Sequence, residues 1–477
     1  MKKYGLIIIG SGSGTNYLEN ILHDNPGMRV AVIDKDEPGG ICLTRGCIPS
    51  KMLLYPADLV RAIGEAKKFG IGADIKKIDF RRLMERMQGK VSMEIRGMRR
   101  GLSNNPAVDY YHEIAEFIAP YTLRVGKEEI TSKMIFLCTG SRPLIPAIKG
   151  LDKAGWLTSD TLLKMSRLPK SIAIIGGGYI AAEYGHFFSA MGAKVTIIGR
   201  NPLFLHEEEP EVSELAKSEM SKFMSILTNH EVIEVRKEKG RKKVIAKDRS
   251  SGRKKTIVAD EIIVAAGRAP NTDLLHPEKG GVKTGKDGWI MVNERLETSQ
   301  PGIWAFGDAL GRHQFKHVAN YGSGVAYKNA FLKKRERTDY HAVPHAIFSH
   351  PEIAGVGLGE KEAVEEYGEK NVLIGFQRYQ DTAKGMAMDA KGFVKVIVKR
   401  GTGKLLGAHI IGPHASVLIH EIIILMNTRE QNAYPILKGM YVHPALSEVV
   451  AMAFGSLMSP SHYHGFLEHL KKHQGLS

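Results

Sequence analysis

LIIIGSGSG, residues 6–14, and SIAIIGGGYIAAE, residues 171–183, share one sequence pattern. In each, an apolar run ends in closely spaced glycines. A helix-length segment and a second apolar run follow, VAVIDK at 30–35 and VTIIGR at 195–200. This order predicts strand, glycine turn, helix and strand, which is a βαβ unit. Because a helix N-terminus behind such a turn binds pyrophosphate, two units predict two dinucleotides on two domains.

The ends of the second strands distinguish the two units. Asp34 ends the first, where a carboxylate accepts hydrogen bonds from an adenosine ribose. Arg200 ends the second, without a nearby carboxylate, which suits a 2′-phosphate and therefore NADP rather than NAD. The alternative is an ordinary surface arginine after a strand. The glycines expected at the two pyrophosphates are Gly10, Gly12 and Gly14 in the first unit and Gly176 and Gly178 in the second.

Length and composition indicate a globular protein of about three domains. No apolar run reaches the roughly 18 residues that span a bilayer, so no membrane association is expected. The three cysteines exclude a disulfide framework and favour a reducing compartment, the cytoplasm. The net charge of +16 comes from Lys and Arg residues that are scattered along the sequence. The sequence contains no recognisable nucleic-acid-binding module. The positive charge therefore indicates a solvated surface. The alternative is that this surface prefers an anionic partner.

The segment GGICLTRGCIPSK, residues 39–51, carries the redox chemistry. Cys42 and Cys47 are five residues apart and can close a small disulfide ring. Arg45, Lys51 and the start of a helix are expected to favour thiolate over thiol. The glycines of the segment allow the backbone to lie close to a planar ring system.

This segment closely resembles the redox motif of the pyridine nucleotide–disulfide oxidoreductases. The resemblance continues in LCTGSRP (137–143), AAGRAPNT (265–272), TSQPGIWAFGD (298–308), GAHIIGPHAS (407–416) and HPALSE (443–448). It implies an α/β fold with two Rossmann-like dinucleotide-binding domains and a C-terminal α+β dimerisation domain. The expected boundaries are 1–147 and 270–338 for FAD, 148–269 for NAD(P) and 339–477 for the interface. It also implies FAD, a second cofactor that is NADP or NAD, and a homodimer.

The resemblance further implies roles for individual residues. Cys47, nearer the flavin, is the charge-transfer thiol, and Cys42 is the interchange thiol that reacts with substrate. His443 from the other subunit is the acid–base, oriented by Glu448. The remaining implied cofactor contacts are Lys51 paired with Glu183 beside flavin N5, Asp308 at the ribityl chain, and Thr139, Gly140 and Gly267.

Some residues depart from the family pattern. Thr15 replaces a third glycine, so the following helix is expected slightly farther from its strand. Tyr441 stands where lipoamide enzymes generally carry a histidine, and Cys138 is interpreted as a buried small side chain. The histidine-rich segment 461–473 is interpreted as an exposed or frayed helix, and no metal site is predicted.

Within the family, dihydrolipoamide dehydrogenase is the first expectation, acting on a small disulfide or a lipoyl domain. The alternative is an NADPH-dependent reductase of low-molecular-weight disulfides, like mycothione or glutathione reductase, which Arg200 and the segment 315–321 favour. A different class is a catalytically silent assembly subunit or an anion-binding module. The intact cysteine pair and His443 argue against that class.

Overall fold

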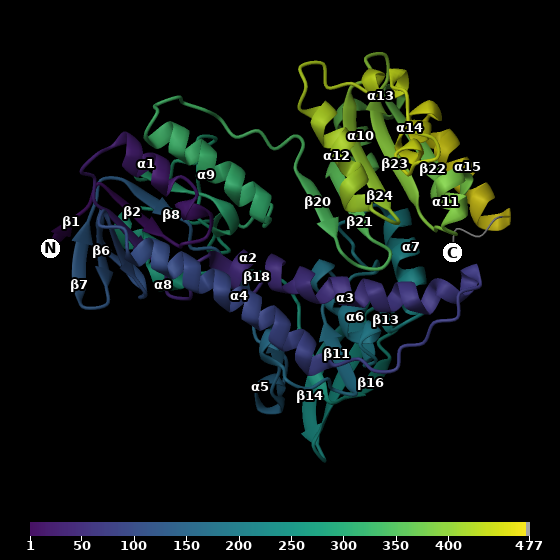
Figure 1. Cartoon of the computed structure of the whole chain (residues 1–477), viewed down its shortest axis with the longest axis horizontal. Coiled ribbons are helices and arrows are strands. Elements are labelled where there is room, and N and C mark those ends of the chain that lie inside the picture. Colours follow the sequence, from purple (N-terminus) through teal and green to yellow (C-terminus); the bar gives the residue numbers. More distant parts are fainter. Residues whose placement is uncertain (474–477) are drawn as a thin grey trace.

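The computed structural model describes residues 1–473 and contains three sheet-based units. In Figure 1 the N-terminal unit lies at the left, the second unit below the centre, and the C-terminal unit at the upper right. Within the described residues, no helix has the length and apolar character needed to cross a membrane.

The N-terminal unit is built on a five-stranded parallel sheet. Every residue of its two central strands is buried, as expected for a parallel sheet covered on both faces. One edge strand comes from beyond residue 300, so the chain returns to this sheet after building the second unit. In spatial order the strands are β19 (Ile303–Ala305), β8 (Ile135–Leu137), β2 (Leu6–Ile9), β3 (Val30–Ile33) and β4 (Val108–Tyr111).

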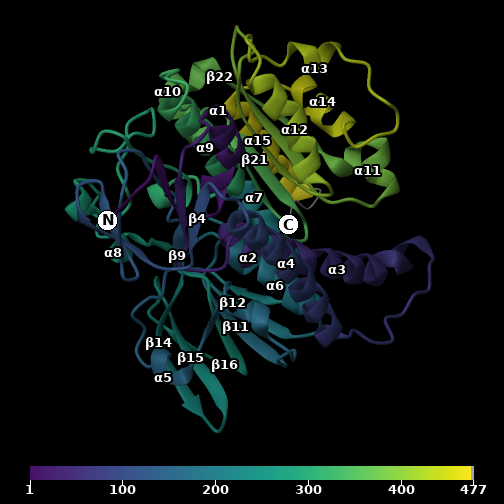
Figure 2. The same cartoon turned by 60° about the vertical axis from the view of Figure 1, so that its left-hand side comes forward.

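The second unit repeats this plan. Its helix α6 (Tyr179–Ala190) follows the second glycine turn and is almost wholly buried. The parallel strands are β10 (Leu157–Thr158), β17 (Glu261–Val264), β11 (Ser171–Ile175), β12 (Lys194–Ile198) and β13 (Ser225–Leu227). A smaller antiparallel sheet projects downward in Figures 1 and 2, with strands β14 (His230–Glu238), β15 (Arg241–Asp248) and β16 (Lys254–Ala259).

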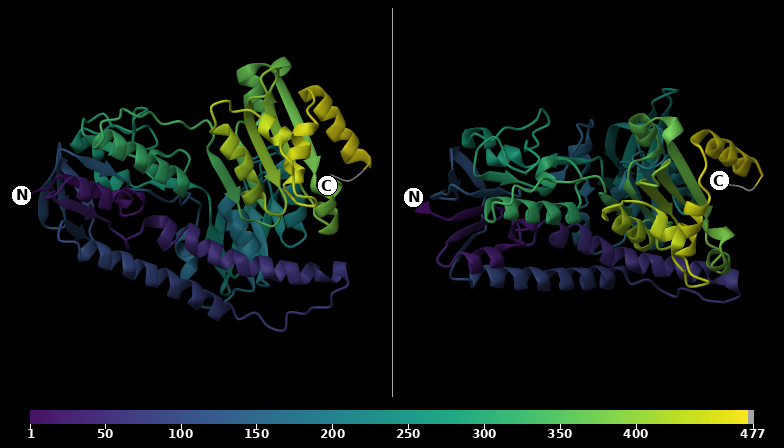
Figure 3. Two further views of the ribbon diagram at one scale, coloured as in Figure 1. Left: turned by 45° about the horizontal axis from the view of Figure 1, so that its top comes forward. Right: turned by 90° about the horizontal axis from the view of Figure 1, so that it is seen from above.

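Two long helices join the N-terminal unit to the second. Helix α3 (Cys47–Glu65) begins at the second redox cysteine and packs against α6. Helix α4 (Phe80–Ser103) returns alongside it, and Asp79 caps its start by accepting a hydrogen bond from the Arg82 N–H at 3.0 Å. Figure 3 shows α4 running along one side of the molecule from the second unit to the first sheet. The helix that carries the chemistry is therefore fixed against both units.

The C-terminal unit is a five-stranded antiparallel sheet with helices packed on it. Its helices include α12 (Ala415–Met426), α14 (Glu448–Gly455) and α15 (Pro460–His473). The strands are β20 (Pro344–Ile347), β21 (Ile353–Gly357), β24 (Leu405–Ile411), β23 (Phe393–Lys399) and β22 (Val372–Arg378). The predicted α/β class, with two dinucleotide-binding units and a C-terminal α+β domain, is confirmed. The residue boundaries of the domains stay a prediction.

A buried ion-pair network ties the second unit to the C-terminal sheet. The ammonium of Lys395, whose side chain is 1% exposed, bonds Glu209 at 2.5 Å, Glu211 at 2.6 Å and Glu360 at 2.7 Å. The Tyr463 hydroxyl of α15 donates to Glu211 at 2.5 Å. The histidine-rich segment thus forms a helix with one face packed, rather than a frayed end. Because the ammonium lies among the three carboxylates, the cluster is a network of ion pairs.

Candidate active site

A cavity of about 870 Å³ opens at the carboxyl ends of the first sheet and extends to α6 and β20. Cofactor pockets span roughly 300–1,000 Å³, so its size fits a dinucleotide. The predicted site residues that line it are Gly10, Gly12, Asp34, Cys42, Cys47, Lys51, Thr139, Gly140, Glu183 and Asp308. Those outside its lining are Gly14, Gly176, Gly178, Arg200, Gly267, His443 and Glu448.

The first glycine turn brings the backbone close to its neighbours. Gly10 has φ +102°, and a Cβ there would lie 2.1 Å from the carbonyl oxygen of Cys138, so only glycine fits. Thr15, at the position of the missing third glycine, donates through its hydroxyl to the Ser11 carbonyl at 3.1 Å. A 3-10 turn, η1 (Ser13–Thr15), precedes helix α1, which begins at Leu18.

Asp34 is held at the edge of this turn. One of its carboxylate oxygens accepts from the Ser11 N–H at 2.8 Å and from the Ser11 hydroxyl at 2.5 Å. The other accepts from the Asp36 N–H at 3.0 Å. These bonds fix the carboxylate in the cavity wall, where the sequence predicted a ribose acceptor.

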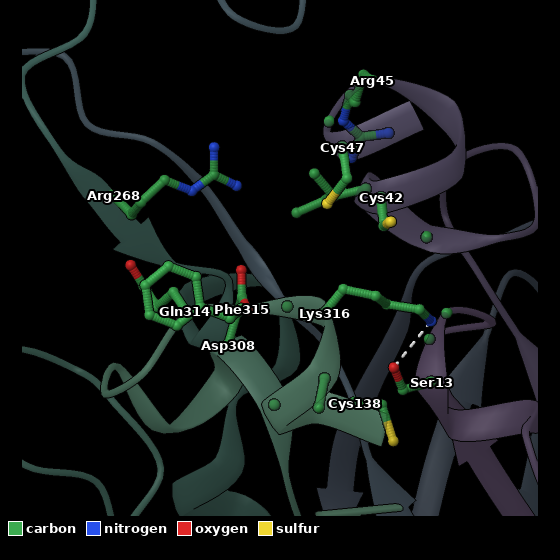
Figure 4. Close-up of a pocket in the computed structure, with 18 of the residues that line it drawn as sticks. Ser13, Cys42, Arg45, Cys47, Cys138, Arg268, Asp308, Gln314, Phe315 and Lys316 are labelled. Carbon is green, nitrogen blue, oxygen red and sulfur yellow. Dashed lines mark hydrogen bonds between the residues drawn. The ribbon is translucent and has the colours of Figure 1, made fainter. Parts of the chain in front are cut away.

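Cys42 and Cys47 are free thiols that hydrogen-bond each other. Cys42 lies in the short helix α2 (Gly40–Thr44), and Figure 4 shows the two side chains next to each other. The hydrogen bond from Cys47 lowers the pKa of Cys42 to about 7, although burial acts in the opposite direction. The same bond, together with burial, raises the pKa of Cys47. Because the bridging proton belongs to the pair, the division of roles between the two sulfurs stays a prediction.

The charges around the thiols match the expectation in part. Backbone N–H groups at the start of α3 help to lower the pKa of Cys42. The field of Lys51 acts to lower the pKa of Cys47, against the larger effects of the hydrogen bond from Cys42 and of burial.

The guanidinium of Arg45 bonds Asp36 at 2.6 Å and Asp160 at 2.9 Å, so two carboxylates offset its charge. Lys316, the first residue of α9 (Lys316–Ala330), is the cation whose field lowers the pKa of Cys42. Its ammonium donates to the Ser13 hydroxyl at 3.0 Å (Figure 4). Sequence reasoning missed Lys316, because nothing in the spacing brings residue 316 to residue 42.

Cys138 lies beneath the glycine turn. A Cβ on Gly14 would approach its sulfur to 3.0 Å, which shows how tightly the two are packed. Burial raises the pKa of Cys138 well above its usual value, so the group stays a neutral thiol. Cys138 is nevertheless only half-buried and lines the cavity, so it is less enclosed than the buried small side chain that the sequence predicted.

Lys51 and Glu183 form the pair that the resemblance implied. The Lys51 ammonium lies 2.8 Å from both carboxylate oxygens, and Glu183 also accepts from the Phe348 N–H at 3.1 Å. The ammonium sits over the Phe348 ring at 4.5 Å. Three elements, α3, α6 and the end of β20, therefore meet at one buried carboxylate. Its position beside a flavin stays a prediction.

The opposite wall of the cavity is polar. Asp308 accepts from the Ser141 hydroxyl at 2.8 Å, and Ser141 accepts from Arg268 at 2.9 Å. The hydroxyl of Thr139 and the amide nitrogen of Gln314 are buried without a partner in the described residues. Buried polar atoms are normally hydrogen-bonded, so these two fit a polar ligand such as the ribityl chain and ring edge of FAD.

The second glycine turn repeats the close approach of the first. Gly176 has φ +138°, and a Cβ there would lie 2.0 Å from the Ala265 carbonyl oxygen. Gly267, two residues after Ala265 in the loop that follows β17, has φ +130°. Arg200 is exposed at the end of β12, and none of residues 1–473 bonds its guanidinium. The Arg249 guanidinium donates to the Arg200 carbonyl at 3.0 Å, so a second cation lies beside it.

His443 and Glu448 form a pair on the C-terminal unit. The His443 Nδ1 lies 2.8 Å from Glu448, which also accepts from the Ala445 N–H at 2.9 Å. The hydrogen bond to His443 keeps the pKa of Glu448 below its usual value. The side chain of His443 is 70% exposed. It does not line the cavity that contains the two thiols of its own chain. Nearby, Met440 and Val442 are also exposed, as residues at a subunit interface are in one chain alone.

Two dinucleotide-binding units, a polar cofactor cavity and a thiol pair define an oxidoreductase that moves electrons between a nucleotide and sulfur. The chain belongs to the pyridine nucleotide-disulphide oxidoreductase family, whose model matches residues 4–323. The model of that family's dimerisation domain matches residues 343–454. The chain is therefore a flavoprotein that uses FAD and NAD(P)H, and its dimerisation domain indicates a homodimer.

Relatives of different specificity are about equally similar. Mycothione reductase from Mycobacterium tuberculosis is 35% identical, over 95% of this chain and 99% of the relative. Dihydrolipoyl dehydrogenase from Synechocystis sp. is 34% identical, over 94% and 98%. In structure, the HOCl-induced flavoprotein disulfide reductase RclA from Escherichia coli superposes with a TM-score of 0.83, at 27% identity over 95% and 99%. These similarities fix the family and leave the substrate open.

Proposed function

We propose that the protein is an NADPH-dependent reductase of a small disulfide. The observation that carries the proposal is Arg200, an exposed and unbonded guanidinium one residue beyond Gly199, which takes the place of Asp34 in the second unit. An arginine forms charge-assisted hydrogen bonds with a 2′-phosphate, and no carboxylate nearby would repel it. The Arg249 guanidinium, held against the Arg200 carbonyl, adds positive charge at the same place.

The cysteine pair carries the sulfur chemistry in this proposal. Bound FAD would supply the two electrons of NADPH to the pair, which would break the Cys42–Cys47 disulfide and leave two thiols. The Cys42 thiolate attacks one sulfur of the substrate disulfide, the substrate S–S bond breaks, and the leaving thiolate takes a proton. The Cys47 thiolate then attacks the Cys42 sulfur, forms the Cys42–Cys47 disulfide and releases the second substrate thiolate. The substrate gains the two electrons that the pair loses.

His443 of the second subunit is the proposed proton carrier. Glu448 accepts from Nδ1 at 2.8 Å, which leaves Nε2 to give a proton to the leaving thiolate. The exposure of His443 and its separation from the cavity of its own chain support action across the dimer. The roles of Asp308 at the ribityl chain and of Lys51–Glu183 at flavin N5 are parts of the same proposal.

Dihydrolipoamide dehydrogenase, the first expectation from the sequence, is the second candidate. The segments 39–51 and 407–416 favour it, as does the 34% identity to a dihydrolipoyl dehydrogenase. In that case the same site would oxidise a dithiol with NAD, and a lipoyl domain would be the partner. An exposed Arg200 has no place in NAD recognition, which puts this candidate second.

A steady-state assay distinguishes the candidates. NADPH and NADH are each tested with small-molecule disulfides, and NAD and NADP with dihydrolipoamide. The proposal predicts the highest kcat/KM for NADPH with a small disulfide. A highest value for NAD with dihydrolipoamide would support the second candidate instead. No turnover in any combination, from a preparation without FAD, would favour the silent assembly subunit.

A further inference from the structure

Helix α4 has one buried face and one charged face. Its buried side chains, among them Met84, Met87 and Val91, pack in the same hydrophobic cluster as Leu53 of α3. On the opposite side, five exposed cations fall within an arc of about 120° and follow the helix for about 27 Å. Figure 3 shows this helix on the outside of the molecule. The cationic row consists of Arg82, Arg86, Lys90, Arg96 and Arg100.

In the described part of the chain, no ion pair engages the cationic row. The two arginines at the sides of the helix are paired, Arg81 with Glu85 at 2.7 Å and Arg99 with Glu37 at 2.5 Å. Glu94 is exposed beside the row and forms no ion pair with it among the described residues. Neighbours in the row are four residues apart at three places, and like charges at that spacing destabilise a helix. An anionic partner would offset this repulsion.

Two glycines lie within the same face, Gly89 and Gly97. Neither has a positive φ, and a Cβ at either position would meet nothing within 4 Å. The fold therefore does not require glycine there, although glycine in a helix interior is destabilising relative to alanine. What the two glycines do is leave the helix backbone uncovered between the cations, so that a second backbone can approach closely.

We propose that the cationic row is a docking surface for an acidic helix of a partner protein. The first three cations are about 6 Å apart along the axis, and carboxylates at every fourth residue of a second helix have the same spacing. Gly89 and Gly97 would let the two helices approach, and Met93, exposed between Lys90 and Arg96, would add an apolar contact at the centre. The inference is independent of the proposed function.

Other occupants fit this face less well. A helix that binds a membrane inserts its apolar face, and the apolar face of α4 is buried in the protein. The phosphate backbone of a nucleic-acid duplex winds away from a straight row, so it would reach fewer of the cations. A second copy of the chain would bring its own net charge of +16 to the row, and charged residues are depleted from the cores of subunit interfaces.

Binding of designed helices tests this inference. The FAD-loaded dimer is titrated into a dye-labelled, alanine-rich peptide with glutamate at every fourth position, and fluorescence anisotropy is measured at low ionic strength. A comparison peptide has the same composition, with its glutamates spread around the helix. We expect the first peptide to bind at least about fivefold more tightly, because only its carboxylates can all face the row.

Removal of the charge should weaken binding of the first peptide by roughly tenfold, since each exposed ion pair is worth a factor of up to about five and four pairs are lost. Glutamine keeps the helix propensity. The variant combines Arg82→Gln, Arg86→Gln, Lys90→Gln and Arg96→Gln. A matched control removes the same charge at exposed lysines elsewhere on the N-terminal unit and should change binding by less than about twofold. It combines Lys127→Gln, Lys279→Gln, Lys283→Gln and Lys286→Gln.

A second variant, Gly89→Gln with Gly97→Gln, tests the close approach. Both side chains enter open space on a helix, so the melting temperature should be equal or higher. They would hold the peptide away from the backbone, and we expect binding at least about threefold weaker. Unchanged binding in this variant would overturn the packing of a helix against the row.

Further results would overturn the inference as a whole. No binding by the wild type would do so, as would equal binding of the two peptides. An equal loss in the row variant and in its matched control would reduce the effect to net charge. Duplex DNA and phosphatidylserine vesicles are titrated in parallel, and tighter binding of either, lost in the row variant, would assign the face to that class of partner instead.

Discussion

The two βαβ units have nearly the same backbone at the glycine turn and differ in the side chains that follow the second strand. In each, the glycine after the first strand has positive φ, and a Cβ there would lie about 2 Å from a carbonyl oxygen of the neighbouring strand end: 2.1 Å at Gly10 and 2.0 Å at Gly176. In the first unit, Asp34 follows the second strand and accepts from Ser11. In the second unit, Gly199 follows the strand, and the exposed and unbonded Arg200 comes one residue later. The backbone of each unit fits a dinucleotide, and Arg200 is the side chain that we propose selects NADPH in the second.

The two units also differ in the chain segments that follow them. The first leads directly into the cysteine pair and the cavity, whereas the second leads through residues 200–209 into the buried network of Lys395. Our proposal therefore puts the redox chemistry on the first unit and the nucleotide choice on the second. Substitutions in each unit can test this separation.

The largest effect is expected from the cysteines. Cys42→Ser or Cys47→Ser should slow disulfide reduction by at least about 10³-fold, because each removes a nucleophile that the exchange requires. NADPH oxidation by ferricyanide, which needs only the two nucleotide sites, should change by less than about threefold. Both rates are measured on the same FAD-loaded preparations.

Absorbance spectra assign the two sulfurs. Partial reduction of the wild type should give a long-wavelength thiolate–flavin band. Cys47→Ser should abolish this band, while Cys42→Ser should keep or strengthen it. Identical spectra from the two variants would contradict the assignment of Cys47 as the thiol nearer the flavin.

The next effect concerns the partner subunit. His443→Gln should slow disulfide turnover by about 10²-fold, the usual scale for a positioned acid–base, while ferricyanide reduction changes far less. Mixing inactive His443→Gln chains with inactive Cys42→Ser chains should restore part of the activity, since one of the two mixed sites keeps both groups. No recovery in a verified heterodimer would mean that the histidine does not act across the interface.

A smaller effect is expected from Asp34, the carboxylate that follows the second strand of the first unit. Asp34→Asn removes the charge from the carboxylate that the sequence predicts as the acceptor for the adenosine ribose, and a charge-assisted bond is worth roughly 1.5–3 kcal/mol. We expect FAD to bind at least about tenfold more weakly, measured by flavin release on dilution, with the NADPH/NADH preference unchanged. A changed preference with unchanged FAD binding would mean that the two units have been assigned the wrong nucleotides.

Local sequence was sufficient to predict much of the fold and part of the site. The glycine spacing and apolar runs predicted both βαβ units, and the motif around Cys42 and Cys47 predicted the thiols of the cavity. Lys51 and Glu183 are 132 residues apart and do meet, but that expectation came from the family resemblance rather than from the spacing.

The charge balance was not predictable from sequence. Arg45 lies between the two cysteines in the chain, yet its guanidinium forms ion pairs with Asp36 and Asp160. The cation whose field lowers the pKa of Cys42 is instead Lys316, some 270 residues away in the chain. Such pairings depend on how the first sheet takes its last strand from beyond residue 300. The packing of α15 through Tyr463 depends equally on a contact with a distant unit, at Glu211.

The proposed role of Arg200 in nucleotide choice is tested by the ratio of kcat/KM for NADPH to that for NADH. This ratio is measured in the wild type and in Arg200→Glu. A charge-assisted bond to the 2′-phosphate corresponds to about 10- to 150-fold, and the exposure of Arg200 puts the expected effect at the lower end. We predict that the wild type accepts NADPH at least as well as NADH, and that Arg200→Glu lowers the ratio about tenfold. A wild type that prefers NADH more than tenfold, with the same ratio in Arg200→Glu, would show that Arg200 does not select the nucleotide.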